Sequence, residues 1–212
     1  MFSKRIEEIA KYLVGLDSLV DIGTDHAYLP IYAIKNMGLK KALATDISPK
    51  ALKIAQKNIE KYDLASSIST LVSDGLDKVE GEYDALVIAG MGGKTILDIL
   101  EKGKDKLVSF KKIIVSAHRD SELVRRFMAL NSYQIVMEKM VFEYKYYEII
   151  IFEKTDGKIQ YSDLEYRYGP ILLEDKEQVF LDCYQEELKR LSQVDSQYVL
   201  DRIKELENIL KK

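Results

Sequence analysis

The sequence contains a single cysteine, Cys183, and no grouping of residues that favours a metal centre. One cysteine excludes an intramolecular disulfide and a cysteine-rich zinc site, and it is typical of a reducing compartment. We interpret Cys183 as a small apolar residue of a helix. No set of metal ligands accompanies either histidine, His26 or His118, so we expect no bound metal.

A strong net charge and long apolar runs are also missing. The 32 Lys and Arg residues nearly balance the 35 Asp and Glu residues, for a formal net charge of -3. Any surface for nucleic acid must therefore be a local basic patch. The first segment, "MFSKRIEEIAKYL", is amphipathic and charged throughout, unlike a signal peptide or a membrane helix. We therefore expect a cytoplasmic protein with no membrane association.

The first two-thirds of the chain alternate short apolar runs with helical patterns. With 212 residues and 47% hydrophobic residues, the chain is long enough for one full domain and an appendage. The runs at 18–23, 41–47, 67–74, 83–90 and 111–118 are typical of strands buried on both faces. Helices are expected at 28–37, 48–64, 94–102 and 120–130, with Ser48 as a cap before Pro49. This alternation predicts an α/β fold with a doubly wound, mostly parallel sheet.

The pattern changes after Asn131. Two strands are expected at about 133–142 and 145–153, and their tight turn predicts an antiparallel final hairpin on the parallel sheet. Beyond Thr155 the segment 161–175 is expected to be irregular, and a C-terminal α-helical hairpin follows, with Asp195 or Ser196 capping its second helix. The expected division is a catalytic domain at 1–155 and a helical, coiled-coil-like appendage at 156–212.

Ligands of doubly wound sheets bind at the carboxyl ends of the strands, and the sequence places polar residues and glycines there. The first expected strand leads into "DIGTDHAYLP" (21–30), in which Gly23 permits a tight turn. Asp46 ends the second strand, at a position suited to a ribose diol. Asp74 can accept a hydrogen bond from an exocyclic amine, and Gly75 leaves room for a flat ring. Together these features predict a cofactor that contains a nucleoside.

The turn after the first strand distinguishes two such cofactors. A pyrophosphate requires an open glycine turn, but Thr24, Asp25 and His26 occupy this one, and a carboxylate repels phosphate. The same carboxylate suits an ammonium or sulfonium group. The hairpin after the fifth strand is similar to the last two strands of class I methyltransferases. We therefore favour S-adenosyl-L-methionine over a dinucleotide as the cofactor.

Four motifs carry a narrower resemblance: "DIGTDHAYLP", "SDGL" (73–76), "IAGMGG" (88–93) and "YRYGPILLE" (166–174). With them the chain resembles the bacterial tRNA (adenine-22-N1)-methyltransferase family over nearly its whole length. The resemblance implies a Rossmann-like catalytic domain, a helical appendage and methyl transfer to N1 of adenine 22 in tRNA. The chain departs from the family at Ser116, Ala117 and His118, where relatives often have a Q-P-N-like turn. His118 is expected to take over any contact of that turn with the base.

The resemblance and the strand ends together define candidate site residues. Asp25 is expected either to stabilise positive charge on the base or to hold the cofactor's ammonium group, and both roles stay open. Tyr28 is a candidate for stacking on the adenine, and Met91 for lining its pocket. The full set comprises catalytic Asp25, Tyr28 and Met91; cofactor-binding Asp21, Gly23, Asp25, His26, Asp46, Ile47, Asp74, Gly75, Ala89 and Gly90; and substrate-binding Arg5, Gly92, His118 and Arg119.

Phosphate contacts to tRNA would come from local cations near the reactive edge. Candidates are Lys4, Arg5 and Lys11 in the first helix and Arg119, Arg125 and Arg126 after the fifth strand. Three alternatives remain: a methyltransferase for a small molecule or a protein, a nicotinamide-dependent oxidoreductase, and a non-enzymatic module that binds S-adenosylmethionine or RNA. The oligomeric state is taken as monomeric, with dimerisation through the C-terminal helices left open.

Overall fold

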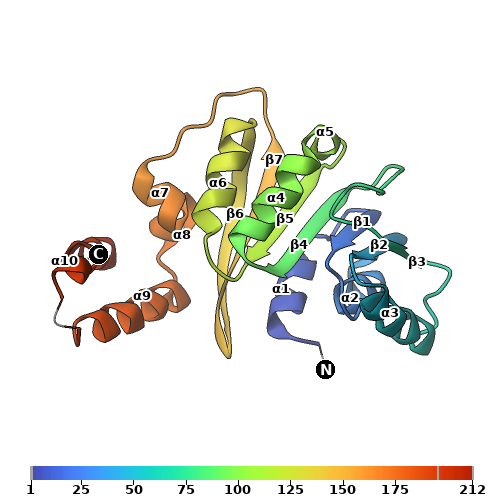
Figure 1. The fold of residues 1–212 in the computed structure, drawn as a ribbon, viewed down its shortest axis with the longest axis horizontal. Helices are drawn as coiled ribbons and strands as arrows, with labels where there is room; N and C mark the ends of the chain where they lie inside the picture. Colours follow the sequence, from blue (N-terminus) through green and yellow to red (C-terminus); the bar gives the residue numbers. More distant parts are fainter. Residues whose placement is uncertain (1, 195, 212) are drawn as a thin grey trace.

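The computed structural model describes residues 2–194 and 196–211, without the side chains of residues 197 and 198. Its centre is a seven-stranded sheet in the order β3-β2-β1-β4-β5-β7-β6 (Figure 1). The strands are β1 (Ser18–Ile22), β2 (Lys41–Asp46), β3 (Ile68–Val72), β4 (Ala85–Met91), β5 (Lys112–Ala117), β6 (Tyr133–Glu143) and β7 (Lys145–Lys154). The first five strands run parallel, which confirms the doubly wound α/β fold.

Helices cover both faces of this sheet because its strands are apolar on both sides. In β1, Leu19 packs on the face covered by α1 (Lys4–Lys11), α2 (Tyr28–Met37) and α3 (Pro49–Lys61). The next residue, Val20, packs on the opposite face with α4 (Gly93–Lys102), α5 (Lys104–Leu107) and α6 (Ser121–Leu130). Successive side chains of a strand point to opposite faces, so two separate cores form. Ser48 caps α3 through its side chain, as predicted.

The antiparallel hairpin is also confirmed. Strand β7 pairs antiparallel with β5, with Ile114 opposite Ile151, and β6 forms the edge of the sheet. Tyr144 makes the turn between them with a φ of 64°. Both hairpin strands are longer than β5, so one end of the hairpin continues beyond the parallel strands.

One local prediction is wrong: the segment 161–175 is not irregular. It forms α7 (Asp163–Tyr168) and α8 (Pro170–Asp175). Ser162 and Glu165 make a capping box at the start of α7, and Pro170 occupies the first turn of α8, where its missing N–H costs nothing. This Ser-x-x-Glu spacing is visible in the sequence and identifies the helix start.

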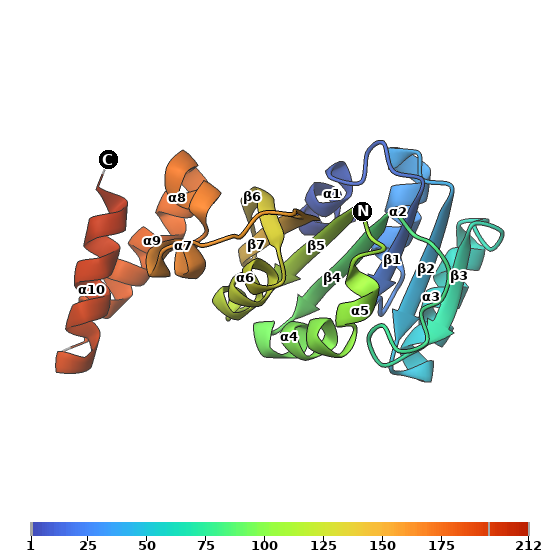
Figure 2. The same cartoon turned by 90° about the horizontal axis from the view of Figure 1, so that it is seen from above.

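The C-terminal helical hairpin consists of α9 (Gln178–Leu191) and α10 (Gln197–Leu210), which lie beside the edge of the sheet (Figure 2). Ser196 directly precedes α10, whereas Asp195, the other predicted cap, lies outside the described residues. Phe180 and Tyr184 of α9 pack with Leu206 of α10 and with Met140 of β6. In the described part of the chain, no helix combines the length and apolar character needed to span a membrane.

A buried ion pair joins the helical segment to the sheet. Arg125, predicted as a surface cation for tRNA, is fully buried, which corrects that prediction. Its Nε donates to Glu138 at 2.7 Å, and its Nη2 donates to Glu148 at 2.6 Å. Its Nη1 donates to the carbonyl of Tyr166 in α7, while Glu138 accepts from the backbone N–H of Ile171 in α8. Every charge in the cluster is therefore paired, as burial requires.

We expect Arg125→Met to lower the free energy of unfolding by about 3–5 kcal/mol, because it leaves the buried Glu138 and the partly buried Glu148 without their counter-charge. The matched control is Arg126→Met. Arg126 is the next residue and pairs with Glu122 and Asp163, but it is 37% exposed, so its loss should cost about 1 kcal/mol or less. Urea unfolding of both variants measures the difference. Equal losses would contradict the central role of the buried pair.

Candidate functional site

The turn from β1 into α2 has an unusual backbone. Gly23, Asp25 and Ala27 all adopt positive φ angles, of 75°, 47° and 57°. A Cβ atom on Gly23 would lie 2.0 Å from the methyl carbon of Met91, so that flexible side chain would have to shift, and the φ of 75° itself favours glycine. Positive φ at Asp25 and Ala27 costs of the order of 1–3 kcal/mol each, and such strain concentrates at functional sites.

Asp21, at the end of β1, is a buried carboxylate beneath this turn. The hydroxyl of Thr24 donates a hydrogen bond of 2.6 Å to its Oδ2. Burial raises the pKa of Asp21 to about 6, although the Thr24 hydrogen bond and the nearby Arg5 favour the charged form. The site therefore holds a negative charge at neutral pH that is only partly compensated.

Arg5, from α1, brings a guanidinium to the same place. Its Cζ lies 4.6 Å from the centre of the Tyr147 ring, a cation–π distance. Its Nη1 is buried and has no hydrogen-bond partner among the described residues. Buried donors in folded proteins are nearly always paired. A free guanidinium donor at this position is therefore suited to an anionic group of a ligand.

These elements surround a cavity of about 240 Å³. Asp25 is exposed and lies 3.2 Å from the Nε2 of His26. The ring of His26 stacks on that of Tyr28, with ring centres 5.2 Å apart. The cavity is lined by Arg5, Ile6, Ile9, Asp21, Gly23, Thr24, Asp25, His26, Tyr28, Leu29, Ala89, Gly90 and His118.

Most of the predicted site residues therefore meet at one cavity. Sequence reasoning missed Ile6 and Ile9 as lining residues, because an amphipathic pattern identifies the apolar face of α1 but not the part of the sheet that it covers. It also missed the buried contact between Thr24 and Asp21. The short spacing of these two residues across a turn is the only signal that could have identified it.

Other predicted residues lie outside this cavity. Asp46 is the last residue of the neighbouring strand β2, and its Oδ1 accepts a hydrogen bond from the backbone N–H of Ser48. Ile47 is 68% exposed. Asp74 lies 3.6 Å from Lys102, and Gly75 is packed near Ile99 of α4. Met91 and Gly92 connect β4 to α4, with Met91 above Gly23. Their proposed roles stay predictions.

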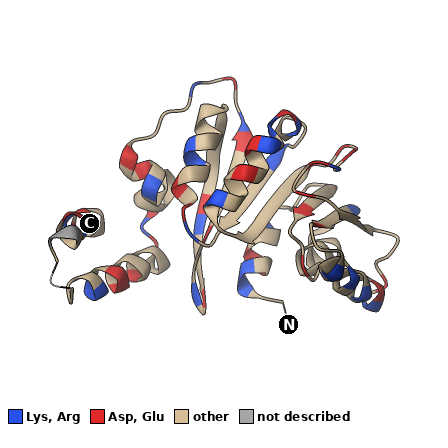
Figure 3. Cartoon of the chain, in the orientation of Figure 1, with Lys and Arg blue, Asp and Glu red and all other residues tan. Residues whose placement is uncertain are grey.

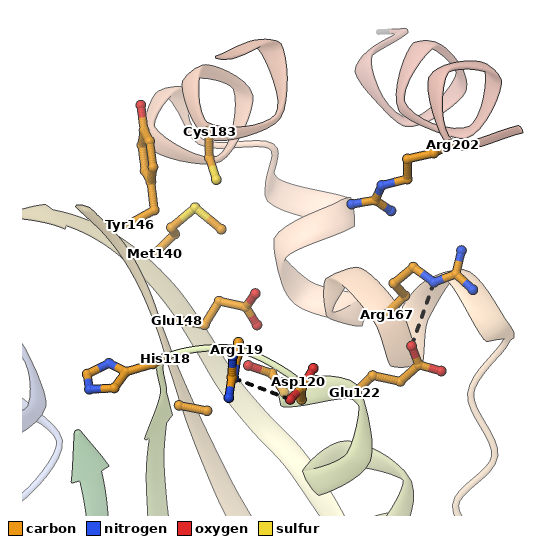
Figure 4. Close-up of a pocket in the computed structure, with 12 residues that line it drawn as sticks. His118, Arg119, Asp120, Glu122, Met140, Tyr146, Glu148, Arg167, Cys183 and Arg202 are labelled. Carbon is orange, nitrogen blue, oxygen red and sulfur yellow. Dashed lines mark ion pairs between the residues drawn. The ribbon is translucent and has the colours of Figure 1, made fainter. Parts of the chain in front are cut away.

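His118 lies between this cavity and a second one of about 390 Å³, because it lines both. The second cavity is bounded by the end of β5, the β6–β7 hairpin and the C-terminal helices, and Glu148 and Arg119 lie along it (Figure 4). Burial lowers the pKa of His118, and the positive charges of Lys145 and Arg5 lower it further. His118 is therefore neutral at physiological pH.

The cations that were predicted to contact tRNA differ in their exposure and in their ion pairs. The Arg119 side chain is 82% exposed and lies 3.8 Å from Asp120. Lys11 pairs with Glu8 at 2.5 Å. Within residues 2–194 and 196–211, no group of three or more His, Cys, Asp or Glu residues is arranged to hold a metal ion.

Comparison with known proteins identifies related chains. The family model described as TrmK, tRNA (adenine(22)-N(1))-methyltransferase, matches residues 19–212. The Bacillus subtilis (strain 168) tRNA (adenine(22)-N(1))-methyltransferase is 35% identical over 201 residues, which cover 92% of this chain and 84% of the relative.

Solved structures agree with this similarity. Streptococcus pneumoniae Sp1610 in complex with S-adenosyl-L-methionine superposes with a TM-score of 0.93, at 31% identity and with 100% of both chains covered. M. capricolum TrmK, in complex with S-adenosyl-homocysteine, has a TM-score of 0.85 at 30% identity, again with 100% of both chains covered.

We expect Asp21→Asn to stabilise the chain at pH 8 by about 2–3 kcal/mol, because the folded-state pKa lies about two units above the ordinary value. A raised pKa means that the folded state binds the proton more tightly. In the wild type, this group therefore adds stability as the pH falls from about 6 towards 4, and its ionisation removes that stability as the pH rises.

The advantage of Asp21→Asn should therefore shrink between pH 8 and pH 5, as measured by urea unfolding at each pH. The control is Asp25→Asn, which removes an exposed carboxylate of the same turn and should give no comparable gain. An advantage of Asp21→Asn that is the same at both pH values would show that the buried charge is not its source.

Proposed function

This chain belongs to the tRNA (adenine(22)-N(1))-methyltransferase family, and we propose that it transfers the methyl group of S-adenosylmethionine to N1 of adenine 22 in tRNA. The observation that carries the proposal is the set of charges in the smaller cavity. The carboxylates of Asp21 and Asp25 line it together with the guanidinium of Arg5, whose Nη1 has no hydrogen-bond partner in the described part of the chain. An amino-acid group has both an ammonium and a carboxylate, and it complements these charges.

The residues that line the smaller cavity suit S-adenosylmethionine better than a dinucleotide, which carries a pyrophosphate. We propose that the buried Asp21 holds the ammonium group and that the Nη1 of Arg5 holds the carboxylate. Gly23, His26, Ala89 and Gly90 supply the backbone around this tail. The nucleoside end is assigned to Asp46, Ile47, Asp74 and Gly75, at the ends of β2 and β3.

Methyl transfer to adenine N1 requires alignment of the reacting atoms rather than proton transfer. When bound, S-adenosylmethionine supplies an electrophilic methyl group on a sulfonium sulfur. Adenine N1 attacks this group with its lone pair, so the N1–C bond forms as the S–C bond breaks, and no proton needs to leave. The contribution of the chain is to hold N1 in line and to exclude water.

The product base is cationic, and the site has a carboxylate to stabilise it. Asp25 is exposed, whereas Asp21 is buried with Thr24. We therefore propose that Asp25 serves the base and Asp21 the cofactor. Because His118 is neutral, it can contact the base without repelling the developing positive charge. Tyr28 and Met91 are proposed to flank the ring.

Recognition of tRNA is proposed to rely on phosphate contacts and on an extruded base. N1 lies on the pairing edge of adenine, so the base must be unpaired before it reacts. Arg119 is an exposed cation that lines the larger cavity, and Lys4 is exposed next to Arg5 of the smaller cavity. Gly92 lies beside the side chain of Arg119 and is proposed to line the entry of the substrate. Affinity for tRNA should fall steeply with salt.

The organisation of the chain is proposed from the same features. We propose a catalytic domain at 1–155 and a helical appendage at 156–212 that supports tRNA binding. A cytoplasmic monomer is proposed. The monomer is supported by the apolar residues Phe180, Tyr184 and Leu206, which are buried against one another and against Met140 of β6.

Unmodified tRNA should accept labelled methyl groups from S-adenosylmethionine, with 1-methyladenosine at position 22 identified by nuclease digestion and mass spectrometry. A tRNA with guanine at position 22 is the matched control and should accept none there. Binding of S-adenosylmethionine without any methylation of tRNA would contradict the proposal, and it would favour a methyltransferase for a small molecule or a protein.

Arg5→Met should weaken binding of S-adenosylhomocysteine by about 10- to 100-fold, because it removes a charged hydrogen bond of about 1.5–3 kcal/mol. It should leave binding of 5′-methylthioadenosine, which lacks the amino-acid group, unchanged. Asp46→Ala should weaken both ligands, since both contain the ribose. Isothermal titration calorimetry of both ligands with the wild type and the two variants gives the six affinities. An equal loss of both ligands in Arg5→Met would overturn the assignment of Arg5 to the carboxylate.

A further inference from the structure

The β6–β7 hairpin reaches beyond the edge of the sheet at which the cavities open. The paired residues of β5 and β7 end at Val115 and Ile150, whereas β6 and β7 stay paired as far as Glu143 and Lys145. Figure 1 shows this projecting end of the hairpin in yellow. It begins beside the site, because the ring centres of His118 and Tyr147 are 5.9 Å apart.

The end of this projection carries an exposed aromatic ring. Tyr144 is 95% exposed and makes the turn with a positive φ. Phe142, two residues earlier, is 49% exposed and packs against Tyr146 with ring centres 4.9 Å apart. Tyr144 and Phe142 therefore place two exposed aromatic rings at the end of the hairpin, where they are available to a partner.

The hairpin end is also held in place, and exposed lysines lie on it and on the neighbouring α1. The carboxylate of Glu143 accepts a hydrogen bond of 2.8 Å from the backbone N–H of Lys4, which ties the end to the start of α1. The Nζ of Lys145 lies 5.1 Å from the centre of the Tyr147 ring. Lys4 and Lys145 are both exposed. Figure 3 shows basic residues on both α1 and the hairpin.

We propose that Tyr144 stacks on a nucleobase of tRNA next to the adenine that is methylated. The inference rests on the proposed function and extends it to a residue outside both cavities. When adenine 22 leaves its stack, it exposes the faces of the neighbouring bases, and an aromatic ring is the side chain that covers such a face. The exposed lysines Lys145 and Lys4 would contact the adjoining phosphates. Tyr144 stands between Glu143, whose carboxylate is engaged by the backbone N–H of Lys4, and the exposed Lys145, and an exposed ring beside a cation is suited to nucleic acid rather than to an apolar protein surface.

The first test compares tRNA methylation by Tyr144→Ala and Tyr144→Phe. Loss of one stacked base lowers affinity by at least about fivefold, so Tyr144→Ala should raise KM for tRNA by that factor or more. Tyr144→Phe keeps the ring and the same backbone strain, and it should remain within about twofold of the wild type. Leu130→Ala, which alters an 84% exposed residue at the end of α6, is the control for loss of an exposed apolar side chain.

Affinity for S-adenosylmethionine should be unchanged in all three variants. A Tyr144→Ala variant with wild-type KM would overturn the proposal while leaving the proposed function intact. Equal damage in Tyr144→Phe and Tyr144→Ala would also overturn it, because the hydroxyl rather than the ring would then matter.

A second measurement separates this inference from catalysis. Unmodified tRNA carrying 2-aminopurine on either side of position 22 is bound by each variant, and the fluorescence of the probe reports stacking. We expect the probe to be quenched in complexes with the wild type and Tyr144→Phe, and to be brighter with Tyr144→Ala. Equal fluorescence in all complexes would overturn the stacking role of Tyr144, whether or not the wild type methylates tRNA. Failure of the wild type to methylate tRNA would instead overturn the proposed function.

Discussion

The buried pairing of Arg125 with Glu138 and Glu148 is the interaction on which the arrangement of the two parts of the chain depends. Arg125 comes from α6, and the two carboxylates come from β6 and β7. Backbone groups of α7 and α8 complete the hydrogen bonds of the cluster. Gly169 lies so close to it that a Cβ atom would approach the Glu138 carboxylate to 2.5 Å. A buried charge is tolerated only when it is fully paired, so the helices have little freedom to dock elsewhere.

Glu148 connects this cluster to the candidate site, because it pairs with Arg125 and also lines the larger cavity. The hairpin that carries Glu138 and Glu148 also forms one wall of the site and presents Tyr144 beyond it. One set of hydrogen bonds thus joins α6, both strands of the hairpin, α7 and α8, and one of its members lines the larger cavity. A substrate as large as tRNA requires such distant contacts to keep a fixed relation to the reacting atoms.

Local sequence patterns were sufficient for the fold and for much of the smaller cavity. Alternating apolar runs and helical periods predicted the doubly wound sheet, and the lack of room for a crossover helix after Asn131 predicted the antiparallel hairpin. Carboxyl ends of parallel strands meet at one edge, so residues such as Gly23, Asp25 and Gly90 could be grouped before the structure was known. The identity of the turn residues alone favoured a cationic ligand group over phosphate.

The sequence by itself therefore determined the element types, the edge at which ligands bind and the charge of the β1–α2 turn, since each depends on residues close together in the chain. Only the tertiary structure decided which charges are free. Arg125 and Arg5 are equally basic in sequence, but packing buries the first among carboxylates and leaves a donor of the second unpaired beside Asp21. Burial and pairing depend on contacts between distant segments, and no local pattern encodes them.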